Sequence, residues 1–425
     1  MPAGFYTIMA AQFFSSLADN ALLVAAIGLL MQLHSPDWLP PYLKFGFVIS
    51  YVVLAPYVGA FADRLPKGQV MFISNTIKVG GCLLMLIGVD PLVAYSLVGL
   101  GAAAYSPAKY GILTEYLPHS RLVAANGWIE GLTVGSIILG TVLGGVLITP
   151  KVSGMLLAFD LPFFESGLDT SAEVAIVAIT FFYVVAAIFN LYIPCTGVPL
   201  KALPSNPWAT LKDFSICCVR LWRDKLGQIS LAVTTLFWGA GATLQFIVIT
   251  WADAALDYNL SQASILQGVV AAGIAAGAVI ASIRVSLDRA VSVVPLGAAM
   301  GLIVIGMIFV REVWIAVPLL VMIGALAGFF VVPMNALLQH RGHHLMGAGR
   351  SIAVQNFNEN ASILLMIWGY SSLIKHGTSI YTAIVTFGLF VAGTMMLVRA
   401  WHRRNLRLYG EEMQSLLTVA RSSHH

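Results

Sequence analysis

Charged residues are scarce in this sequence of 425 residues, in which Asp, Glu, Lys and Arg together make up only 10%. Soluble domains carry about 25% charged residues, so this chain has too little polar surface to cover a water-soluble globule. Hydrophobic residues make up 59% and occur in long runs, whereas about 20 apolar residues suffice for a helix to cross a bilayer. The composition therefore excludes a soluble enzyme and predicts an all-α membrane protein.

Motifs that would indicate catalysis, a metal or a disulfide framework are also missing. The four cysteines have no paired spacing, and Cys217 and Cys218 are adjacent, which suits neither a zinc site nor a bridge. The sequence has no Gly-rich phosphate loop and no nucleophile elbow. None of the nine histidines has an Asp five positions on, the spacing with which acyltransferases often activate a hydroxyl. We therefore expect no enzyme activity, no metal and no cofactor.

Hydrophobic runs separated by polar or Pro/Gly breaks predict twelve transmembrane helices. The first six are expected near 4–33, 42–62, 69–89, 91–116, 121–149 and 172–194. The second six are expected near 227–252, 261–283, 291–310, 313–338, 348–374 and 378–400. The first run begins at Gly4 without the basic region and cleavage site of a signal peptide, so we expect it to be a span itself. These segments predict an N-terminal six-helix bundle (1–194), a cytoplasmic linker (195–225), a C-terminal six-helix bundle (226–404) and a cytoplasmic tail (405–425).

The distribution of basic residues gives the expected orientation. With both termini in the cytoplasm, the cytoplasmic loops, helix ends and tail hold 18 Lys and Arg residues, and the opposite side holds four. Lys78 lies within a span and is counted on neither side. Because cytoplasmic segments of membrane proteins are rich in Lys and Arg, we predict that both termini are cytoplasmic.

The linker contains an amphipathic segment. An apolar helical face and a polar one are predicted between residues 208 and 223. The apolar face comprises Trp208, Leu211, Phe214, Cys218, Leu221 and Trp222, and the polar face Lys212, Asp213, Arg220 and Arg223. Tryptophan and basic residues are typical of a helix at headgroup depth. We expect an interfacial helix that tethers the two bundles.

The two halves show matching features that indicate an internal repeat. Residues 107–113 (PAKYGIL) at the end of span four correspond to 333–338 (PMNALL) at the end of span ten. The starts of spans five and eleven correspond at residues 125–126 and 355–356. Two parallel six-helix repeats about an axis normal to the membrane are the plan of the major facilitator superfamily, whose fold the sequence therefore predicts.

The segment GAFADRLPKG at 59–68 resembles the signature of that superfamily between spans two and three. In the superfamily, the Asp and Arg of this signature latch neighbouring helices on the cytoplasmic side. The resemblance implies a gating role for Asp63 and Arg64. Pro66 stands where a second glycine is usual, so the match is partial.

Several polar side chains fall at bilayer depth, where charge is costly and marks either a pathway or a buried pair. The candidates for substrate contact are Asp19, Asn20, Lys109, Tyr110, Asn126, Glu130, Gln245, Asn335, Asn356 and Glu359. Spans one, four, seven and ten line the central cavity in the superfamily, so Asp19 and Lys109 are expected to converge there. Opposite charges at one cavity suit a zwitterionic headgroup that carries both ammonium and phosphate. A structural ion pair or hydrogen bond between helices is the alternative for each residue.

Longer motifs resemble the bacterial lysophospholipid transporters of this superfamily. They lie at 19–23 (DNALL), 101–113 (GAAAYSPAKYGIL), 125–127 (ANG), 237–241 (FWGAG), 328–339 (GFFVVPMNALLQ) and 353–360 (AVQNFNEN). The resemblance covers essentially the whole chain. It implies a monomer in the bacterial inner membrane that moves lysophosphatidylethanolamine and lysophosphatidylglycerol from the outer to the inner leaflet by alternating access. It also implies an acyltransferase/acyl-carrier-protein synthetase as functional partner, which reacylates the lipids.

Two points stay open in this interpretation. The family pattern has a basic residue in span seven where this sequence has Gln245, so either Lys109 contributes more to phosphate binding or the headgroup preference differs. An ion-coupled exporter of drugs or other small amphipathic molecules is the alternative function, because membrane carboxylates serve proton coupling equally well and a fold does not determine its cargo.

Overall fold

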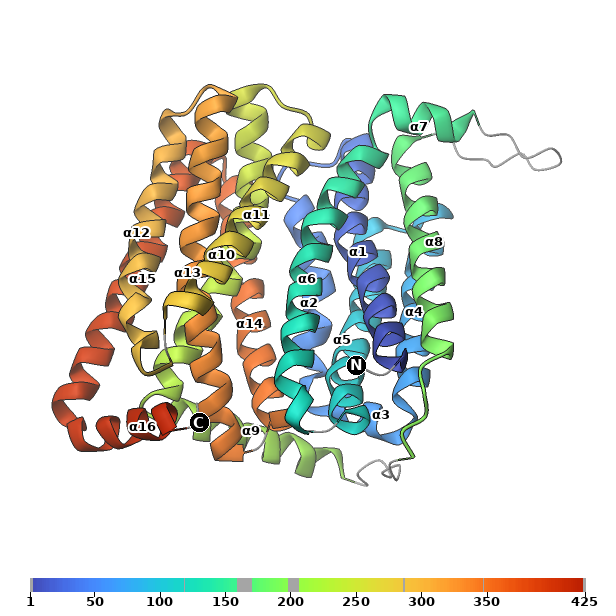
Figure 1. The fold of residues 1–425 in the computed structure, drawn as a ribbon. Helices are drawn as coiled ribbons and strands as arrows, with labels where there is room; N and C mark the ends of the chain where they lie inside the picture. The colour runs from blue at the N-terminus through green and yellow to red at the C-terminus, as the bar shows by residue number, and fades with distance from the viewer. Residues whose placement is uncertain are drawn as a thin grey trace. The chain divides into compact units, whose positions relative to one another are not determined.

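The computed structural model describes residues 3–117, 119–158, 170–197, 206–285, 287–346 and 348–422, and in these ranges every regular element is a helix (Figure 1). The first helices are α1 (Ala3–Gln32), α2 (Pro40–Val53), α3 (Ala55–Arg64), α4 (Lys67–Leu86), α5 (Pro91–Tyr116), α6 (His119–Leu147), α7 (Pro150–Leu157) and α8 (Ser171–Leu191). They are followed by α9 (Pro207–Arg223), α10 (Gly227–Leu256), α11 (Leu260–Arg284), α12 (Val294–Ile305), α13 (Val313–Met346), α14 (Ala348–Lys375), α15 (Ile380–Leu408) and α16 (Gly410–Ser422). Two 3-10 helices, Leu287–Val293 and Gly306–Phe309, flank α12.

A helix, or a pair of short helices, occupies each of the twelve predicted spans. Among the described residues, eight helical segments are long and apolar enough to cross a membrane, and a ninth counts if α6 and α7, bent by 69°, form one span. The second predicted span is divided at Leu54 into α2 and α3, of 14 and 10 residues, each too short to cross alone. The all-helical membrane fold is thus confirmed, whereas the count of twelve is confirmed only in part.

Local sequence signals explain where several helices begin. Asp90 precedes α5 and its side chain accepts a hydrogen bond from the Leu92 amide at 2.8 Å, with Pro91 in the first turn. Thr170 and Glu173 form a reciprocal capping box at the start of α8. These caps satisfy backbone amides that have no partner within the helix.

The described chain forms two compact units. Unit 1 comprises Met1–Pro207 with Tyr258–Gly268, and unit 2 comprises Trp208–Asp257 with Val269–His425. The amphipathic α9 therefore belongs to unit 2. The division into two bundles, a linker and a tail stays a prediction.

In unit 1, glycines of α6 allow close approach to α1. A Cβ at Gly144 would lie 2.6 Å from the carbonyl oxygen of Ala21, and one at Gly140 would collide with the carbonyl of Leu17. Small residues at such crossings let helix backbones pack closely where lipid supplies no hydrophobic driving force. The α1–α6 contact is the framework that positions the polar middle of α1.

Unit 2 contains a tighter crossing, between α11 and α13. Each helix contributes a GxxxG pair, Gly273 with Gly277 and Gly324 with Gly328. A Cβ at any of these four glycines would collide with a backbone carbonyl of the other helix, at 2.5 Å for Gly273 and the Val321 oxygen. The backbones are therefore in direct contact, and no larger residue fits without moving a helix.

The amphipathic α9 packs against helix ends of unit 2. Cys217 and Leu221 are buried in a cluster with Leu231, Leu338 and Val354. On the same helix, the Trp222 indole donates to Asn358 Oδ1 at 3.0 Å, and Arg220 donates to the Leu345 carbonyl at 3.2 Å. Residues 207–223 thus form a helix, and part of its apolar face packs on α10, α13 and α14. Trp208, predicted on the same face, is exposed instead, and the location of the helix at the membrane interface stays a prediction.

Candidate functional site

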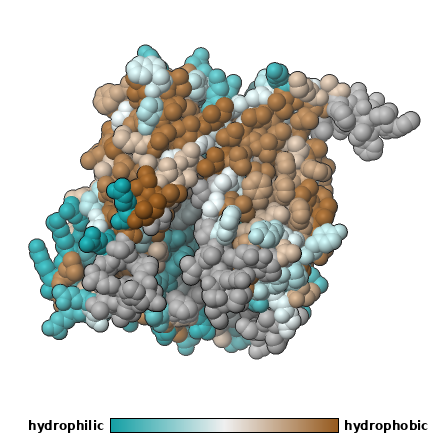
Figure 2. All heavy atoms as spheres, viewed as in Figure 1, coloured by the Kyte–Doolittle hydropathy of each residue, from teal (hydrophilic) through white to brown (hydrophobic). Residues whose placement is uncertain are grey.

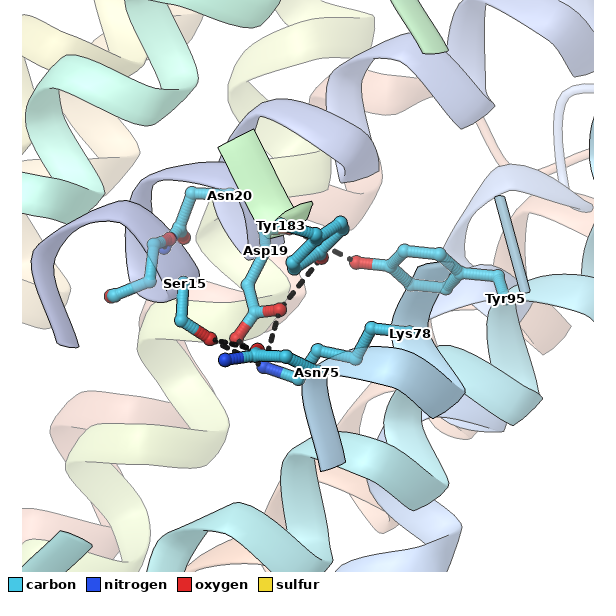
Figure 3. A network of polar contacts seen from close by, with 8 residues as sticks. Ser15, Asp19, Asn20, Asn75, Lys78, Tyr95 and Tyr183 are labelled. Carbon is cyan, nitrogen blue, oxygen red and sulfur yellow. Dashed lines mark hydrogen bonds and ion pairs between the residues drawn. The ribbon is translucent and has the colours of Figure 1, made fainter. Parts of the chain in front are cut away.

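A charged network lies in the middle of α1 (Figure 3). Both carboxylate oxygens of Asp19 accept from the Lys78 ammonium of α4 at 2.9 Å. The hydroxyl of Tyr183 on α8 donates to Asp19 Oδ1 at 2.7 Å. Three helices that are distant in the sequence thus meet at one carboxylate.

Lys78 is enclosed more completely than its partner. Its side chain is 1% exposed, whereas that of Asp19 is 22% exposed. The Lys78 ammonium also donates to Ser15 Oγ at 3.0 Å, and it lies 5.1 Å from the ring of Tyr105 and 5.5 Å from that of Tyr183. Oxygen acceptors and ring faces together replace the water that a buried ammonium loses. Lys78 therefore neutralises Asp19 from the protein side, and the remaining exposed edge of Asp19 is the part that a ligand can reach.

Two buried polar atoms beside this network have no hydrogen-bond partner among the described residues. They are Nδ2 of Asn75, whose Oδ1 accepts from Ser15 at 2.7 Å, and the hydroxyl of Tyr105. Buried polar groups are normally satisfied by protein or water. Both side chains surround the Asp19–Lys78 pair, because Asn75 is bound by Ser15 and the Tyr105 ring lies beside the Lys78 ammonium.

Reasoning from the sequence missed most of this network. The sequence marks Lys78 only as a lysine within a predicted span, and Tyr183, Ser15 and Asn75 are not among the predicted site residues. Two signals were present in the sequence: Ser15 and Asp19 are four residues apart on α1, and Asn75 and Lys78 are three apart on α4. What the sequence does not carry is the rotation of α4 that turns Lys78 toward α1.

The predicted cationic residue of span four is also buried. Lys109 is 8% exposed, and its ammonium lies 4.6 Å from the ring of Tyr110. Lys109 follows Tyr105 by four residues and so shares its helix face, one turn from the ring that contacts Lys78. This places both candidate charges in one region of unit 1. Their convergence on a single cavity stays a prediction.

Unit 2 holds a second polar cluster. The Gln355 amide donates to Asn335 Oδ1 at 2.6 Å and to Glu359 Oε1 at 2.8 Å. Gln355, which is not among the predicted site residues, thereby joins two that are: Asn335 on α13 and Glu359 on α14. Glu359 is 6% exposed, and a carboxylate at this depth is stabilised by such donors.

The remaining candidates do not join these clusters through any hydrogen bond described here. Asn20 donates to the Ser16 carbonyl of its own helix at 2.8 Å, and the Asn356 carbonyl accepts from Asn360. Gln245 is half-buried on α10. The side chains of Asn126, Glu130 and the predicted gating residue Asp63 lie outside the described part of the structure. No group of three or more metal-binding side chains occurs among the described residues.

The predicted gating region contains a buried pair that involves a different residue. Arg64 is exposed at the end of α3. Lys67, 6% exposed, instead donates to the Ala62 carbonyl at 2.8 Å and pairs with Glu115 at 3.3 Å. Thr196 donates to the second oxygen of Glu115 at 3.0 Å. Lys67 therefore links α3, α4, α5 and the segment after α8, and is not the solvated loop charge that its position suggests.

Solved transporter structures share this fold. A POT family transporter, PepTSo, aligns with 96% of this chain and 99% of its own at a TM-score of 0.70 and 12% identity. A bacterial homolog of the human lysosomal transporter Spinster, inward-facing and unoccupied, aligns with 96% and 97% at a TM-score of 0.68 and 12% identity. At this identity the likeness concerns the fold alone.

Sequence relatives are much more similar. Residues 8–366 match the Major Facilitator Superfamily. The lysophospholipid transporter LplT of Pectobacterium carotovorum subsp. carotovorum (strain PC1) is 42% identical over 374 residues, which cover 88% of this chain and 87% of that protein. LplT of Salmonella arizonae is 40% identical over 405 residues, covering 94% and 96%. The chain therefore belongs to the Major Facilitator Superfamily and, within it, to the family of the bacterial lysophospholipid transporters.

Proposed function

We propose that this protein transports lysophospholipids from the outer to the inner leaflet of the bacterial inner membrane by alternating access. The observation that carries the proposal is the Asp19–Lys78 pair, in which the ammonium is enclosed while 22% of the Asp19 side chain stays exposed. The exposed edge of Asp19 is the polar surface that this network leaves open to a headgroup. The 42% identity to a lysophospholipid transporter supports this cargo.

The charges of unit 1 suit the two ends of a lysophospholipid headgroup. Because Lys78 neutralises Asp19, the exposed edge of Asp19 accepts a hydrogen bond from either an ammonium or a hydroxyl. Lys109 supplies a cation for the phosphate. Such a site binds both lysophosphatidylethanolamine and lysophosphatidylglycerol. The ammonium of the first and the glycerol hydroxyls of the second can each donate a hydrogen bond to Asp19, and neither needs a full negative charge there. Gln245 offers an amide where the family has a basic residue, so Lys109 carries most of the phosphate binding.

The rest of the proposal concerns cellular context. The protein acts as a monomer and a carrier rather than an enzyme, and the lipids it delivers are reacylated by an acyltransferase/acyl-carrier-protein synthetase. Both termini lie in the cytoplasm, as the excess of Lys and Arg on that side supports. Asn20, Asn126, Glu130, Asn335, Asn356 and Glu359 are further candidates for headgroup contact or for the conformational change.

Replacing Lys109 with alanine is expected to lower the initial rate of lysophospholipid flipping at least about tenfold, because one charge-assisted contact to phosphate is lost. The measurement is leaflet-resolved movement of labelled lysophosphatidylethanolamine in proteoliposomes, with and without imposed ion gradients. Lys151→Ala, which removes an exposed lysine on α7, is the matched control and should match the wild type. Wild-type protein that moves drugs but no lysophospholipid would establish the exporter alternative instead.

The orientation can be tested with the native cysteines. Cys195 is exposed, whereas Cys82 and Cys217 are buried, and burial raises the pKa of the Cys218 thiol to about 11. Because Cys195 is exposed and burial disfavours the reactive thiolate of Cys218, Cys195 should react with a maleimide faster than Cys218 at neutral pH. A membrane-impermeant maleimide should label the protein in permeabilised cells and not in intact cells, and Cys195→Ser should remove the signal. Labelling of Cys195 in intact cells would reverse the orientation.

A further inference from the structure

The outward face of α9 combines basic and large apolar side chains. Lys212 and Arg223 are exposed on it, and so are Trp208, Ile216 and Val219, with Trp208 76% exposed. The opposite face is buried against α10, α13 and α14. The buried face already provides the packing of α9 on unit 2. The exposed apolar side chains on its outward face therefore indicate surroundings that are themselves partly apolar.

The end of α15 presents the same combination. Arg403, Arg404 and Arg407 are exposed there. Between and after them, Leu406, Leu408 and Tyr409 are exposed by 41%, 60% and 42%. Figure 2 shows hydrophilic residues gathered around the corner where α15 meets α16, below a largely hydrophobic surface.

These two surfaces are joined. The Lys225 ammonium, just after α9, lies 4.1 Å from the ring of Tyr409, and Asn405 donates to the Lys225 carbonyl at 3.3 Å. The rings of Trp222 and Trp401 stack with centroids 6.4 Å apart. In Figure 1, α9 and α16 both run across the same ends of the unit 2 helices. The basic residues of α9 and α15 thus belong to one continuous rim.

We propose that this rim is a binding surface for anionic phospholipid headgroups of the leaflet that surrounds it. We call it the basic collar, defined by its exposed cations Lys212, Arg220, Arg223, Arg403, Arg404 and Arg407. The ends of these helices combine aromatic and leucine side chains with Lys and Arg. The aromatic and leucine side chains suit the boundary between headgroups and acyl chains, and the basic side chains suit the lipid phosphate. An acidic protein partner would pair with the cations but would not require the interleaved apolar residues to be so widely exposed.

Nearby carboxylates do not cancel the charge of the collar. Asp213 pairs with Arg350 at 3.2 Å, and Asp224 is bound by Arg341 at 2.7 Å. Glu411 and Glu412 are exposed in the first turn of α16, where the helix dipole stabilises them. The six cations therefore leave the surface positive. The lipid bound here is a bilayer phospholipid at the periphery of unit 2, distinct from any transported cargo, so the inference does not depend on the proposed function.

The test compares phosphatidylglycerol with phosphatidylcholine of the same chains as ligands of the purified full-length protein, measured by native mass spectrometry from detergent. We expect the wild type to bind phosphatidylglycerol at least about tenfold more tightly, a preference that salt screening weakens between about 50 and about 500 mM. This preference should be lost in a variant with five glutamine substitutions in the collar, Lys212→Gln/Arg223→Gln/Arg403→Gln/Arg404→Gln/Arg407→Gln. The control Lys44→Gln/Lys151→Gln, which removes cations outside the collar, should keep it.

Three results would overturn the proposal. They are equal binding of the two lipids by the wild type, a preference unaffected by salt, and a preference retained by the glutamine variant. The salt series uses the wild type alone, so it decides the matter even if the glutamine variant fails to fold. Flipping of lysophospholipid in neutral liposomes should be the same for wild type and variant; that separates failure of the collar from failure of the transport proposal.

Discussion

Replacing Lys78 with methionine is expected to lower the thermal midpoint of the protein by about 10 °C and to abolish lysophospholipid transport. The ammonium is 1% exposed and is bound by both oxygens of Asp19. Removing one partner of a buried pair leaves an uncompensated charge, at a cost of about 3 kcal/mol or more, and each kcal/mol shifts the midpoint by about 2–4 °C in a unit of this size. Thermal unfolding in detergent and flipping in proteoliposomes measure the two effects.

The double variant Asp19→Asn/Lys78→Met separates folding from transport. It removes both charges while keeping similar shapes, and such replacements are often neutral for stability. We expect the thermal midpoint to recover most of the loss while flipping stays absent, because an amide oxygen accepts a hydrogen bond from the headgroup more weakly than the carboxylate and is no longer held in place by Lys78. Lys151→Met on the exposed face of α7 is the control and should change neither property. A Lys78→Met protein with normal stability and normal flipping would remove the network from both roles.

The single variant Asp19→Ala changes two properties of the network at once. Asp19→Ala removes the carboxylate that binds the buried Lys78 ammonium. The variant therefore leaves Lys78 as an uncompensated buried charge and alters the cargo site at the same time. Loss of transport in that variant alone therefore cannot be assigned to headgroup binding. Asp19→Asn with Lys78 retained is affected in the same direction, since an amide oxygen only partly replaces the carboxylate.

Replacing Gly277 with alanine is expected to lower the thermal midpoint by about 5 °C, and replacing it with leucine should prevent accumulation of folded protein. A Cβ at this position collides with the carbonyl of Ala325 on α13. Overpacking of this kind costs about 1–3 kcal/mol for a small side chain, and neighbouring glycines on both helices leave no direction in which to relax. Thermal unfolding and yield of monodisperse protein are the measurements.

A matched control for this prediction lies in the same unit. Gly393 is in the interior of α15, and a Cβ there meets nothing within 4 Å. Gly393→Ala should leave the midpoint unchanged or raise it, because alanine favours a helix over glycine by about 1 kcal/mol. Equal effects of the two alanine substitutions would show that helix propensity, and not the α11–α13 crossing, determines the outcome.

The sequence alone predicted the features that depend on local composition. Span four was expected at 91–116, and α5 covers Pro91–Tyr116. The sequence likewise predicts the membrane class, the superfamily fold and the lysophospholipid transporter family. These features follow from the sequence because a bilayer demands about 20 apolar residues wherever a helix crosses it. That requirement concerns one segment at a time, and the family motifs are contiguous in the sequence.

Only the tertiary structure decided which polar groups meet. Asp19 and Lys78 are 59 positions apart, and Lys67 and Glu115 come from different helices, so no spacing rule pairs them. Gln355, which joins Asn335 to Glu359, gained its role from the packing of α13 against α14. The physical reason is that an apolar helix is compatible with lipid at any rotation about its axis. Packing at the glycine crossings and against neighbouring helices fixes one rotation for each helix, and this rotation determines which charged side chains face each other.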